Sequence, residues 1–365
     1  MHTADFAFDL PEALIAQSPA RPRDSARLLR VAPGAPKKGA PGDAAPEDGG
    51  VRDLPGVLRP GDLMVVNDTR VIPARLRARR TRDGGEARVE IMLNRAEADG
   101  TWHALVRNAR KLRAGDVLVV EGAPELAPRV VEAPVEGAVR LDFGPDPAVL
   151  AAALERAGEI PLPPYIARPE GPRPEDREDY QPIFARTPGA VAAPTASLHF
   201  TPELLAALEA RGVGRATLTL HVGAGTFLPL RGEDPRGQSL HAEWGEVTEE
   251  AAGAINKTRA RGGRVVAIGT TALRLLEAAT GEDGVTRPFR GLTDIFLLPG
   301  HRFRGADLLL TNFHLPRSTL FMLVCAFGGT ERMRAAYAHA VREGYRFYSY
   351  GDACLIDRDD EEPGR

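Results

Sequence analysis

The sequence TLTLHVGAGTFLPLR, residues Thr217–Arg231, decides the fold of this chain. An alternating hydrophobic strand runs up to His221 and gives way to the glycine-rich loop Gly223–Thr226. Glycine lets the backbone adopt positive φ and lets a ligand approach main-chain N–H groups closely, while histidine is the side chain that changes charge near neutral pH. The stretch therefore predicts a strand that ends in a ligand-binding loop, with a plain tight turn as the alternative.

The same arrangement recurs twice further along the chain. The apolar run Val265–Ile268 leads into Gly269–Thr271, and Leu308–Leu310 leads into Thr311–His314. Three such strands would place their loops along one edge of a sheet, which is where open α/β sheets bind ligands. A tight turn accounts for any one of these loops, whereas the three together favour a shared site.

Helices and strands alternate through the second half of the chain. Thr201 begins a helix that closes at Gly212, and Thr248 begins another that ends at Gly262. This alternation is typical of an α/β domain. The further expected elements are a helix over Ala272–Ala279, a strand over Ile295–Leu298, a helix capped by Ser318 or Thr319 that runs through Phe327, and a helix capped by Thr330 that ends at Gly344.

Residues 75–143 have a different sequence pattern, with short β-type runs and no stretch that convincingly predicts a helix. Turn signals such as Asp83-Gly84-Gly85 separate the runs, a spacing typical of a small barrel or sandwich. A helix capped by Asp146 follows and stops at Gly158. The predicted fold is an α/β catalytic body, residues 1–73 and 146–365, with an inserted small antiparallel β-barrel domain, residues 74–145. The expected barrel strands are Arg88–Leu93, Trp102–Val106, Val117–Val120, Arg129–Val131 and Val139–Phe143.

Length and composition restrict the class of protein. With 365 residues the chain exceeds the ~250–300 residues at which single cores stop growing, so two domains are expected. The low-complexity segment Ala32–Gly50 buries little apolar surface and is predicted to be a disordered loop. Cys325 and Cys354 lack the CxxC spacing of a zinc site. The N-terminus does not have the sequence pattern of a signal peptide, and no apolar run is long enough to span a bilayer. A cytoplasmic protein is expected.

The net charge of −3 gives no global basic field, but arginines cluster within residues 75–82 and 107–113. Guanidinium groups pair bidentately with phosphates, so these clusters predict contacts with an RNA backbone. A solvated arginine-rich surface is the alternative. The residues expected to contact RNA are Arg77, Arg79, Arg80, Arg110 and Lys111.

Generic catalytic motifs are missing from the sequence. The segment Gly223–Leu228 lacks the third glycine of a dinucleotide-binding fingerprint, and P-loop, HExxH and GxSxG patterns are absent. Polar residues at loop tips remain, and together they would supply acid–base chemistry without a metal. Those in or beside the loops are Asp68, Thr69, Arg70, His199, His221, His241, Glu243, Thr270, Thr271, Arg274, Asp294, Asn312, His314 and Asp352.

The chain resembles the S-adenosylmethionine:tRNA ribosyltransferase-isomerases of queuosine biosynthesis. Ordered motifs carry this resemblance from one end of the sequence to the other. Departures are small, such as Ser197 where glycine is expected and Phe184 where tyrosine is common. The motifs are FDLPEALIAQSPARPRDSARLL (Phe8–Leu29), GDLMVVNDTRVIPARL (Gly61–Leu76), IPLPPYI (Ile160–Ile166), DYQPIFARTPGAVAAPTASLHF (Asp179–Phe200), TLHVGAGTFLPLR (Thr219–Arg231), HAEW (His241–Trp244), GTTALRLLE (Gly269–Glu277), TDIFLLPG (Thr293–Gly300), TNFHLPRSTLFMLVCAF (Thr311–Phe327) and YRFYSYGDACLI (Tyr345–Ile356).

The resemblance implies transfer of the ribosyl group of S-adenosylmethionine to 7-aminomethyl-7-deazaguanine at the tRNA wobble position, with loss of adenine and methionine, to give epoxyqueuosine. The five-carbon ring requires a new C1′–C5′ bond, so a general base must remove the C5′ proton that the sulfonium acidifies. The former ring oxygen then displaces methionine, and departing adenine needs a proton donor. S-adenosylmethionine is a cosubstrate here, and no metal or other cofactor is expected.

Under this interpretation His221 is the expected base, and Asp294 or His314 orients it or serves adenine, with Glu243 as a further catalytic candidate. A monomer acting on tRNA is expected. A non-catalytic RNA-binding relative and an S-adenosylmethionine-dependent RNA methyltransferase are the alternatives. The residues expected to bind substrate are Asp68, Thr69, Arg70, His199, Gly223, Gly225, Thr226, Thr270, Thr271, Arg274 and Asn312.

Overall fold

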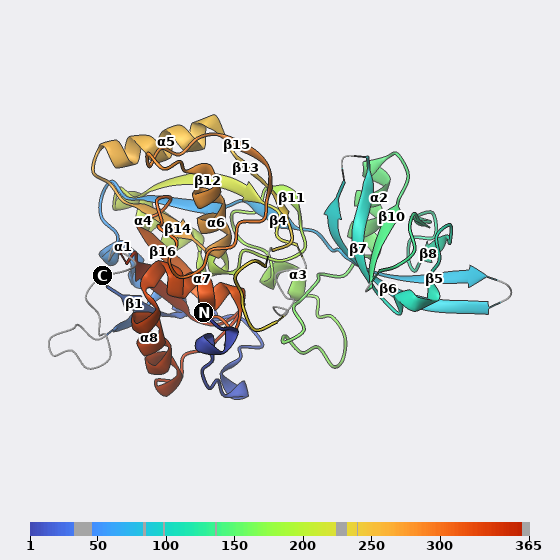
Figure 1. The fold of residues 1–365 in the computed structure, drawn as a ribbon, viewed down its shortest axis with the longest axis horizontal. Coiled ribbons are helices and arrows are strands. Elements are labelled where there is room, and N and C mark those ends of the chain that lie inside the picture. The colour runs from blue at the N-terminus through green and yellow to red at the C-terminus, as the bar shows by residue number, and fades with distance from the viewer. Residues whose placement is uncertain are drawn as a thin grey trace.

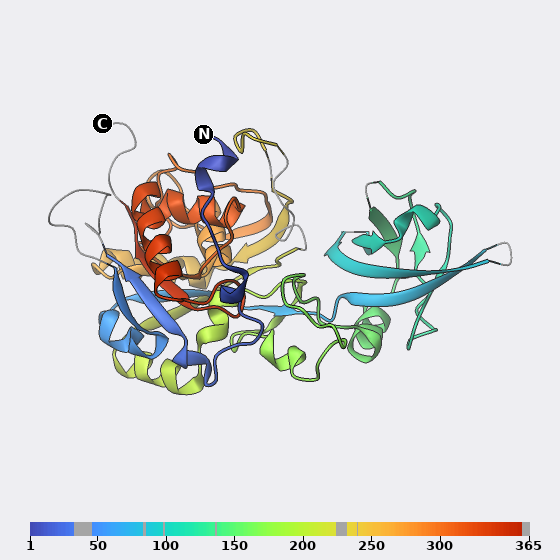
Figure 2. The ribbon, with the colours of Figure 1, turned by 90° about the horizontal axis from the view of Figure 1, so that it is seen from below.

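A computed structural model describes residues 1–32, 46–82, 85–97, 99–135, 137–223, 232–238 and 240–359. It contains an α/β body and a smaller β-rich part that projects from it (Figures 1 and 2). The central sheet of the body has nine strands in the order β15-β13-β12-β3-β14-β16-β17-β1-β2. Their bounds in this order are Phe289–Thr293, Glu243–Val247, Gly214–Leu220, Leu63–Asn67, Val265–Ile268, Leu308–Asn312, Ala353–Asp357, Arg27–Val31 and Glu47–Gly50.

Four neighbouring strands in the middle of this sheet, β12, β3, β14 and β16, are parallel to one another. Their carboxyl ends therefore meet at one edge of the sheet, as predicted for the three strands that precede the loops. The strands on either side are antiparallel to this group, since β13 pairs antiparallel with β12 and β17 with β16.

Alternation along β3 shows how the sheet separates two cores. Val65 packs with helices α5 to α8 in one buried cluster, whereas Met64 and Val66 pack with α1, α4 and the short helix η6 in another. Successive side chains of a strand point to opposite faces, so one apolar run supports both layers. The helices are α1 (Leu54–Val57), α3 (Asp176–Asp179), α4 (Pro202–Ala210), α5 (Glu249–Ala260), α6 (Thr270–Ala279), α7 (Thr319–Gly328), α8 (Thr330–Arg342), and the 3-10 turns η1 (Thr3–Phe6), η2 (Glu12–Leu14), η3 (Arg23–Ser25), η4 (Val51–Asp53), η5 (Ala109–Lys111) and η6 (Thr195–His199).

The projecting part is a six-stranded antiparallel sheet in the order β8-β5-β6-β7-β10-β9. A bridge between Val117 and Arg129 joins the ends of this order, so the sheet is nearly closed into a small barrel. The fold is thus the predicted α/β body with an inserted antiparallel barrel. The strands are β5 (Arg75–Arg82), β6 (Gly85–Ala96), β7 (Thr101–Arg107), β8 (Leu118–Val120), β9 (Arg129–Val130) and β10 (Ala138–Asp142).

Helix α2 (Pro147–Ala157) begins after the predicted cap Asp146, whose side chain accepts a hydrogen bond from Ala148 N. The expected domain boundary at residue 145 places α2 with the body, whereas its Leu150 and Leu154 are buried in the barrel core. Helix α2 packs on the barrel because its apolar side chains are buried in the barrel core. A short parallel pair, β4 (Thr69–Val71) and β11 (Thr187–Ala190), lies where the chain leaves the body for the barrel.

Three local predictions are wrong. The expected strand Ile295–Leu298 is not a strand: β15 ends at Thr293, and the carbonyl of Ile295 instead accepts a hydrogen bond from Arg274 Nε. Glu47–Gly50, expected within a disordered loop, pairs with β1 as β2, while residues 33–45 of that loop lie outside the described part of the chain. Helix α8 is capped by Gly329 rather than Thr330.

Candidate active site

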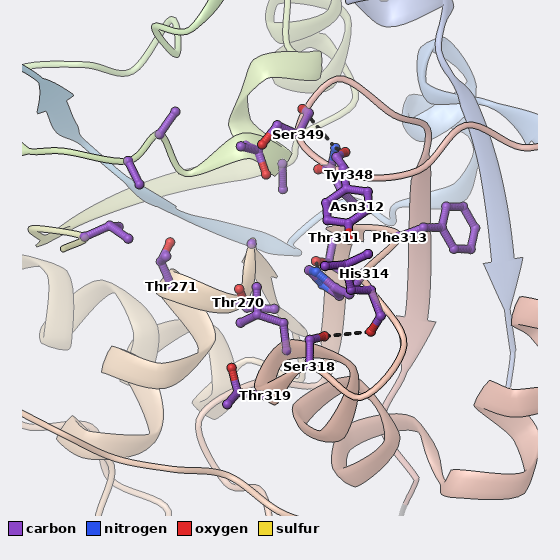
Figure 3. A pocket seen from close by; sticks show the side chains of 18 of the residues that line it. Thr270, Thr271, Thr311, Asn312, Phe313, His314, Ser318, Thr319, Tyr348 and Ser349 are labelled. Atoms are coloured by element: carbon purple, nitrogen blue, oxygen red, sulfur yellow. Dashed lines mark hydrogen bonds between the residues drawn. The ribbon is translucent and has the colours of Figure 1, made fainter. Parts of the chain in front are cut away.

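A cavity of about 610 Å³ opens at the sheet edge where the parallel strands β14 and β16 end (Figure 3). Gly269–Thr271 follow β14 and open helix α6, and Thr311–His314 complete β16 and the turn after it. Of the residues expected to form the site, four line this cavity together: Thr270, Thr271, Asn312 and His314. Its size is that of an ordinary small-molecule pocket.

His221 follows β12 at the same edge, and its neighbour Val222 lines the cavity. The imidazole Nδ1 is 2.8 Å from Thr69 Oγ1, and the ring stacks on Trp244 at 5.2 Å between centroids. Burial lowers the pKa of His221 to about 4, so the ring is neutral at pH 7, as a general base must be. Its basicity is weaker than the near-neutral pKa expected for this role.

Gly189 packs closely against the His221 ring. A Cβ added to this glycine would lie 2.7 Å from His221 Cε1 and 2.8 Å from Nε2, and its φ is +152°. Both the contact and the backbone conformation require glycine here. The sequence prediction missed Gly189, although it lies in the motif Asp179–Phe200.

His314 is held more deeply than His221. Its Nε2 lies 2.9 Å from Thr311 Oγ1, and its backbone N–H donates to the Tyr337 hydroxyl at 3.1 Å. Burial lowers the pKa of His314 to about 3. The side chain is therefore neutral at the cavity wall (Figure 3).

A buried ion pair lies beside Gly223. Glu243 Oε2 accepts a hydrogen bond from Arg274 Nη1 at 2.7 Å, and Glu243 Oε1 accepts one from Gly223 N at 2.9 Å. The pair thereby fixes the start of the loop that follows β12. Asp294 has an exposed side chain beside Ile295, whose carbonyl also binds Arg274.

Asn67, which the sequence prediction passed over, joins these groups. Its Oδ1 accepts from the backbone N–H groups of Thr69 and Leu220, and its Nδ2 donates to Leu220 O and lies 3.4 Å from Thr271 Oγ1. One buried amide at the end of β3 thus fixes both the residue that contacts His221 and a threonine of the cavity. Only its position at a strand end signalled it.

The chain was compared with known proteins. Residues 3–356 match the family described as queuosine biosynthesis protein. A protein of Gluconacetobacter diazotrophicus named S-adenosylmethionine:tRNA ribosyltransferase-isomerase is 62% identical over 97% of this chain and 96% of its own length, and one of the same name from Acidiphilium cryptum is 55% identical over 98% and 100%. A crystal structure of an S-adenosylmethionine tRNA ribosyltransferase from Thermotoga maritima is 35% identical, covers 96% of this chain and 99% of its own, and has a TM-score of 0.52.

This chain belongs to the queuosine biosynthesis protein family.

Other residues expected in the site of this family member lie apart from the cavity or outside the described residues. Asp68 is buried at the end of β3, where burial raises the pKa of its carboxyl and Thr219 Oγ1 donates to it at 2.6 Å. Arg70 is exposed and pairs with Glu155 of α2. Gly225 and Thr226 lie outside the described residues.

His199 lies in a separate small hollow rather than in the cavity. Burial lowers its pKa to about 4, against the opposing charge of Asp352. Sequence reasoning also missed Tyr165, Tyr348 and Ser349, which line the cavity. Tyr165 Oη lies 2.7 Å from Ser349 Oγ, and the ring centroids of Tyr165 and Tyr348 are 4.1 Å apart. They lie in two of the family motifs.

The buried His199 predicts a loss of stability in acid. Its folded pKa of about 4 lies below the ordinary value of 6.5, so the unfolded chain takes up the proton first as the pH falls. The free energy of unfolding should therefore decrease from pH 6.5 toward pH 4, by about 2 kcal/mol at pH 5 from this group alone. Urea unfolding of His199→Gln at pH 7.5 and pH 5 should show a pH dependence about 2 kcal/mol smaller than that of the unaltered protein, and an equal dependence would contradict the assignment.

Within the described residues, no group of three or more His, Cys, Asp or Glu side chains is arranged to hold a metal ion. In that same part of the chain, no helix is both long enough and apolar enough to cross a membrane.

Proposed function

We propose that this chain is a transferase that moves and isomerises the ribosyl group of S-adenosylmethionine onto 7-aminomethyl-7-deazaguanine at the tRNA wobble position, giving epoxyqueuosine and releasing adenine and methionine. The close relatives that carry this activity in their names support the proposal over nearly the whole chain. The observation that carries it is a small-molecule cavity at the end of the parallel strands, in a chain whose inserted barrel carries exposed arginines.

Two neutral histidines near one sheet edge support acid–base roles. His221 is the proposed base for the C5′ proton, with Thr69 holding its Nδ1 so that Nε2 is left for proton transfer. His314 lines the cavity and is proposed to serve adenine. Glu243 is committed to Arg274 and Gly223, which favours a positioning role, and the exposed Asp294 remains a candidate proton donor.

The barrel supplies the proposed tRNA contact. Arg77 and Arg79 point outward from β5, and Arg110 and Lys111 are exposed in η5. Arg80 points inward and is 9% exposed, so the predicted phosphate contact of Arg80 is wrong. Side chains alternate between the two faces of β5, and Arg80 lies on the internal face.

Contact between the barrel and the body supports a route from bound RNA to the cavity. A Cβ on Gly223 would lie 2.8 Å from Asn94 Oδ1 of β6, and Arg95 Nη1 donates to Ala242 O at 3.4 Å. The glycine loop after His221 therefore begins against the barrel. A nucleotide held by the barrel near Asn94 would lie close to Gly223.

The double variant Arg77→Ala/Arg79→Ala is expected to weaken tRNA binding and to reduce the slope of log K against log salt by about 1.4–1.8, because each lost phosphate contact contributes about 0.7–0.9. Filter binding from 50 to 300 mM KCl measures the slope, and S-adenosylmethionine binding should not change. Arg290→Ala, which alters an exposed arginine of β15 in the body, is the matched control. An unchanged slope in the double variant would show that both arginines belong to a solvated surface and do not contact phosphates.

One incubation separates the proposed function from its alternatives. With S-adenosylmethionine and tRNA that carries 7-aminomethyl-7-deazaguanine, we expect adenine and methionine in equal amounts and epoxyqueuosine in the tRNA. S-adenosylhomocysteine would indicate a methyltransferase, and tRNA binding without a small-molecule product would indicate a non-catalytic relative.

We infer that the protein works in the cytoplasm, where its tRNA substrate is, and as a monomer, since the cavity is built by a single chain. Sedimentation equilibrium should give one chain mass, and a larger mass at micromolar concentration would contradict the monomer.

A further inference from the structure

The amino end of helix α6 is open toward the cavity. Gly269 is its N-cap, with φ +91°, and has no side chain to bind the first N–H groups. The N–H groups of Thr270, Thr271 and Ala272 meet no acceptor in the described part of the chain. A helix amino end of this kind carries partial positive charge and three free donors.

The other long helices close their amino ends. Side chains of Asp146, Thr201, Thr248 and Ser318 accept backbone N–H hydrogen bonds at the starts of α2, α4, α5 and α7. Helix α8 also begins after a glycine, but the carboxylate of Asp359 lies against Gly329 there. Helix α6 alone among these described helices leaves its first turn facing a cavity with no side chain over it.

Thr270 adds a side-chain donor to the same place. The residue is 6% exposed and lines the cavity, and its hydroxyl has no hydrogen-bond partner in the described part of the chain. Figure 3 shows Thr270 at the cavity, facing the loop of His314 and Ser318. This hydroxyl is therefore free to donate a hydrogen bond to a ligand in the cavity.

The rest of the cavity wall favours an anion. No aspartate or glutamate is among the described residues that line it, and the one permanently charged side chain among them is Arg317. A second helix amino end, that of α7 at Ser318–Leu320, lies on the same wall. The wall therefore presents the open amino end of α6 and the amino end of α7, which Ser318 caps, and its described residues include no carboxylate.

We propose that the open end of α6, with Thr270, binds the α-carboxylate of S-adenosylmethionine. This inference rests on the proposed function, because it takes that molecule as the ligand. The carboxylate is the only anionic group of S-adenosylmethionine, and two methylene groups and Cα separate it from the sulfonium. Binding at α6 thus keeps the positive sulfur away from the positive helix end, and it directs the ribose away from α6.

The test combines two ligands with two variants. Thr270→Asp places a carboxylate in the first turn of α6, where it is compatible with the helix, and it competes with the ligand's carboxylate. Thr270→Val removes only the hydroxyl. Calorimetry would measure the affinity of each protein for S-adenosylmethionine and for its decarboxylated analogue. Thr330→Val alters the equivalent first residue of α8 and is the matched control.

We expect the unaltered protein to bind the decarboxylated analogue roughly 10–100-fold more weakly than S-adenosylmethionine, the range for hydrogen bonds to a charged group. Thr270→Asp should lose a similar factor for S-adenosylmethionine, and Thr270→Val roughly 5–10-fold, while both bind the analogue within about threefold of the unaltered protein. The affinity for tRNA and all affinities of Thr330→Val should not change.

The proposal would be overturned by equal affinity of the unaltered protein for the two ligands or by equal loss for both ligands in the Thr270 variants. Loss of tRNA affinity alone would also overturn it, because the anion would then be an RNA phosphate. If Thr270→Asp does not fold, the affinities of Thr270→Val for the two ligands still test the proposal. Adenine release by the unaltered protein tests the proposed function separately. Release together with undiminished S-adenosylmethionine binding in Thr270→Asp would reject the carboxylate site and keep the function.

Discussion

The variant His221→Ala is expected to lower turnover by a factor of about 10²–10⁴, the usual contribution of a positioned general base, while fold and tRNA affinity persist. His221 follows β12 at the edge where the cavity opens, and its ring contacts Gly189 and stacks on Trp244, with Nδ1 at Thr69 Oγ1. A base held by these contacts loses little freedom when it reacts. Exchange of the C5′ hydrogen with solvent deuterium reports proton removal directly, and adenine release reports turnover.

The pH profile adds a readout that a structural role would not move. Because burial lowers the pKa of His221 to about 4, the base stays unprotonated well into acid. The acid limb of kcat/KM should therefore lie near pH 4 rather than near pH 6.5. Thr69→Ser keeps the hydroxyl that holds Nδ1 and should retain activity, whereas Thr69→Val should lose much of it. Continued C5′ exchange in His221→Ala would exclude His221 as the base, and Asp294 or Glu243 would be tested next.

The sequence predicted the helices and strands that are determined by residues close together in the chain. The strand over Val265–Ile268 has the expected bounds, and Thr201, Thr248 and Ser318 cap their helices because each oxygen reaches an N–H within three residues. Long-range pairing was not predictable in this way. Glu47–Gly50 has a polar, glycine-rich sequence and forms a strand only because β1 offers it an edge.

The same distinction between local and long-range causes applies to the residues of the candidate site. Strand-end reasoning found Thr270, Thr271 and His314 because parallel strands bring their carboxyl ends together. It could not find Gly189, whose requirement for glycine comes from the ring of His221, far along the chain. Arg80 shows the converse error: a cluster of like residues was read as one surface, and the two-residue period of β5 turned one of them inward.

The second large effect is expected from breaking the buried pair of Glu243 and Arg274. Their side chains are 6% and 5% exposed, with Oε2 and Nη1 2.7 Å apart. The variant Arg274→Met leaves the Glu243 carboxylate buried without its cation, which should lower the free energy of unfolding by about 3–5 kcal/mol. The exposed pair Asp283–Arg287 is the matched control, and Arg287→Ala should cost less than about 1 kcal/mol. Urea unfolding at pH 7.5 measures both.

The double variant Glu243→Gln/Arg274→Met separates stability from function. Removing both charges takes away the uncompensated carboxylate, so much of the lost stability should return. The introduced glutamine side chain keeps a carbonyl oxygen for the N–H of Gly223, the contact that fixes the start of the loop after His221. If the pair only positions that loop, the double variant should regain S-adenosylmethionine binding along with stability. If Glu243 also moves a proton, binding returns and turnover does not. A loss below about 1 kcal/mol in Arg274→Met alone would show that water reaches the pair, and would remove it as the support of the loop.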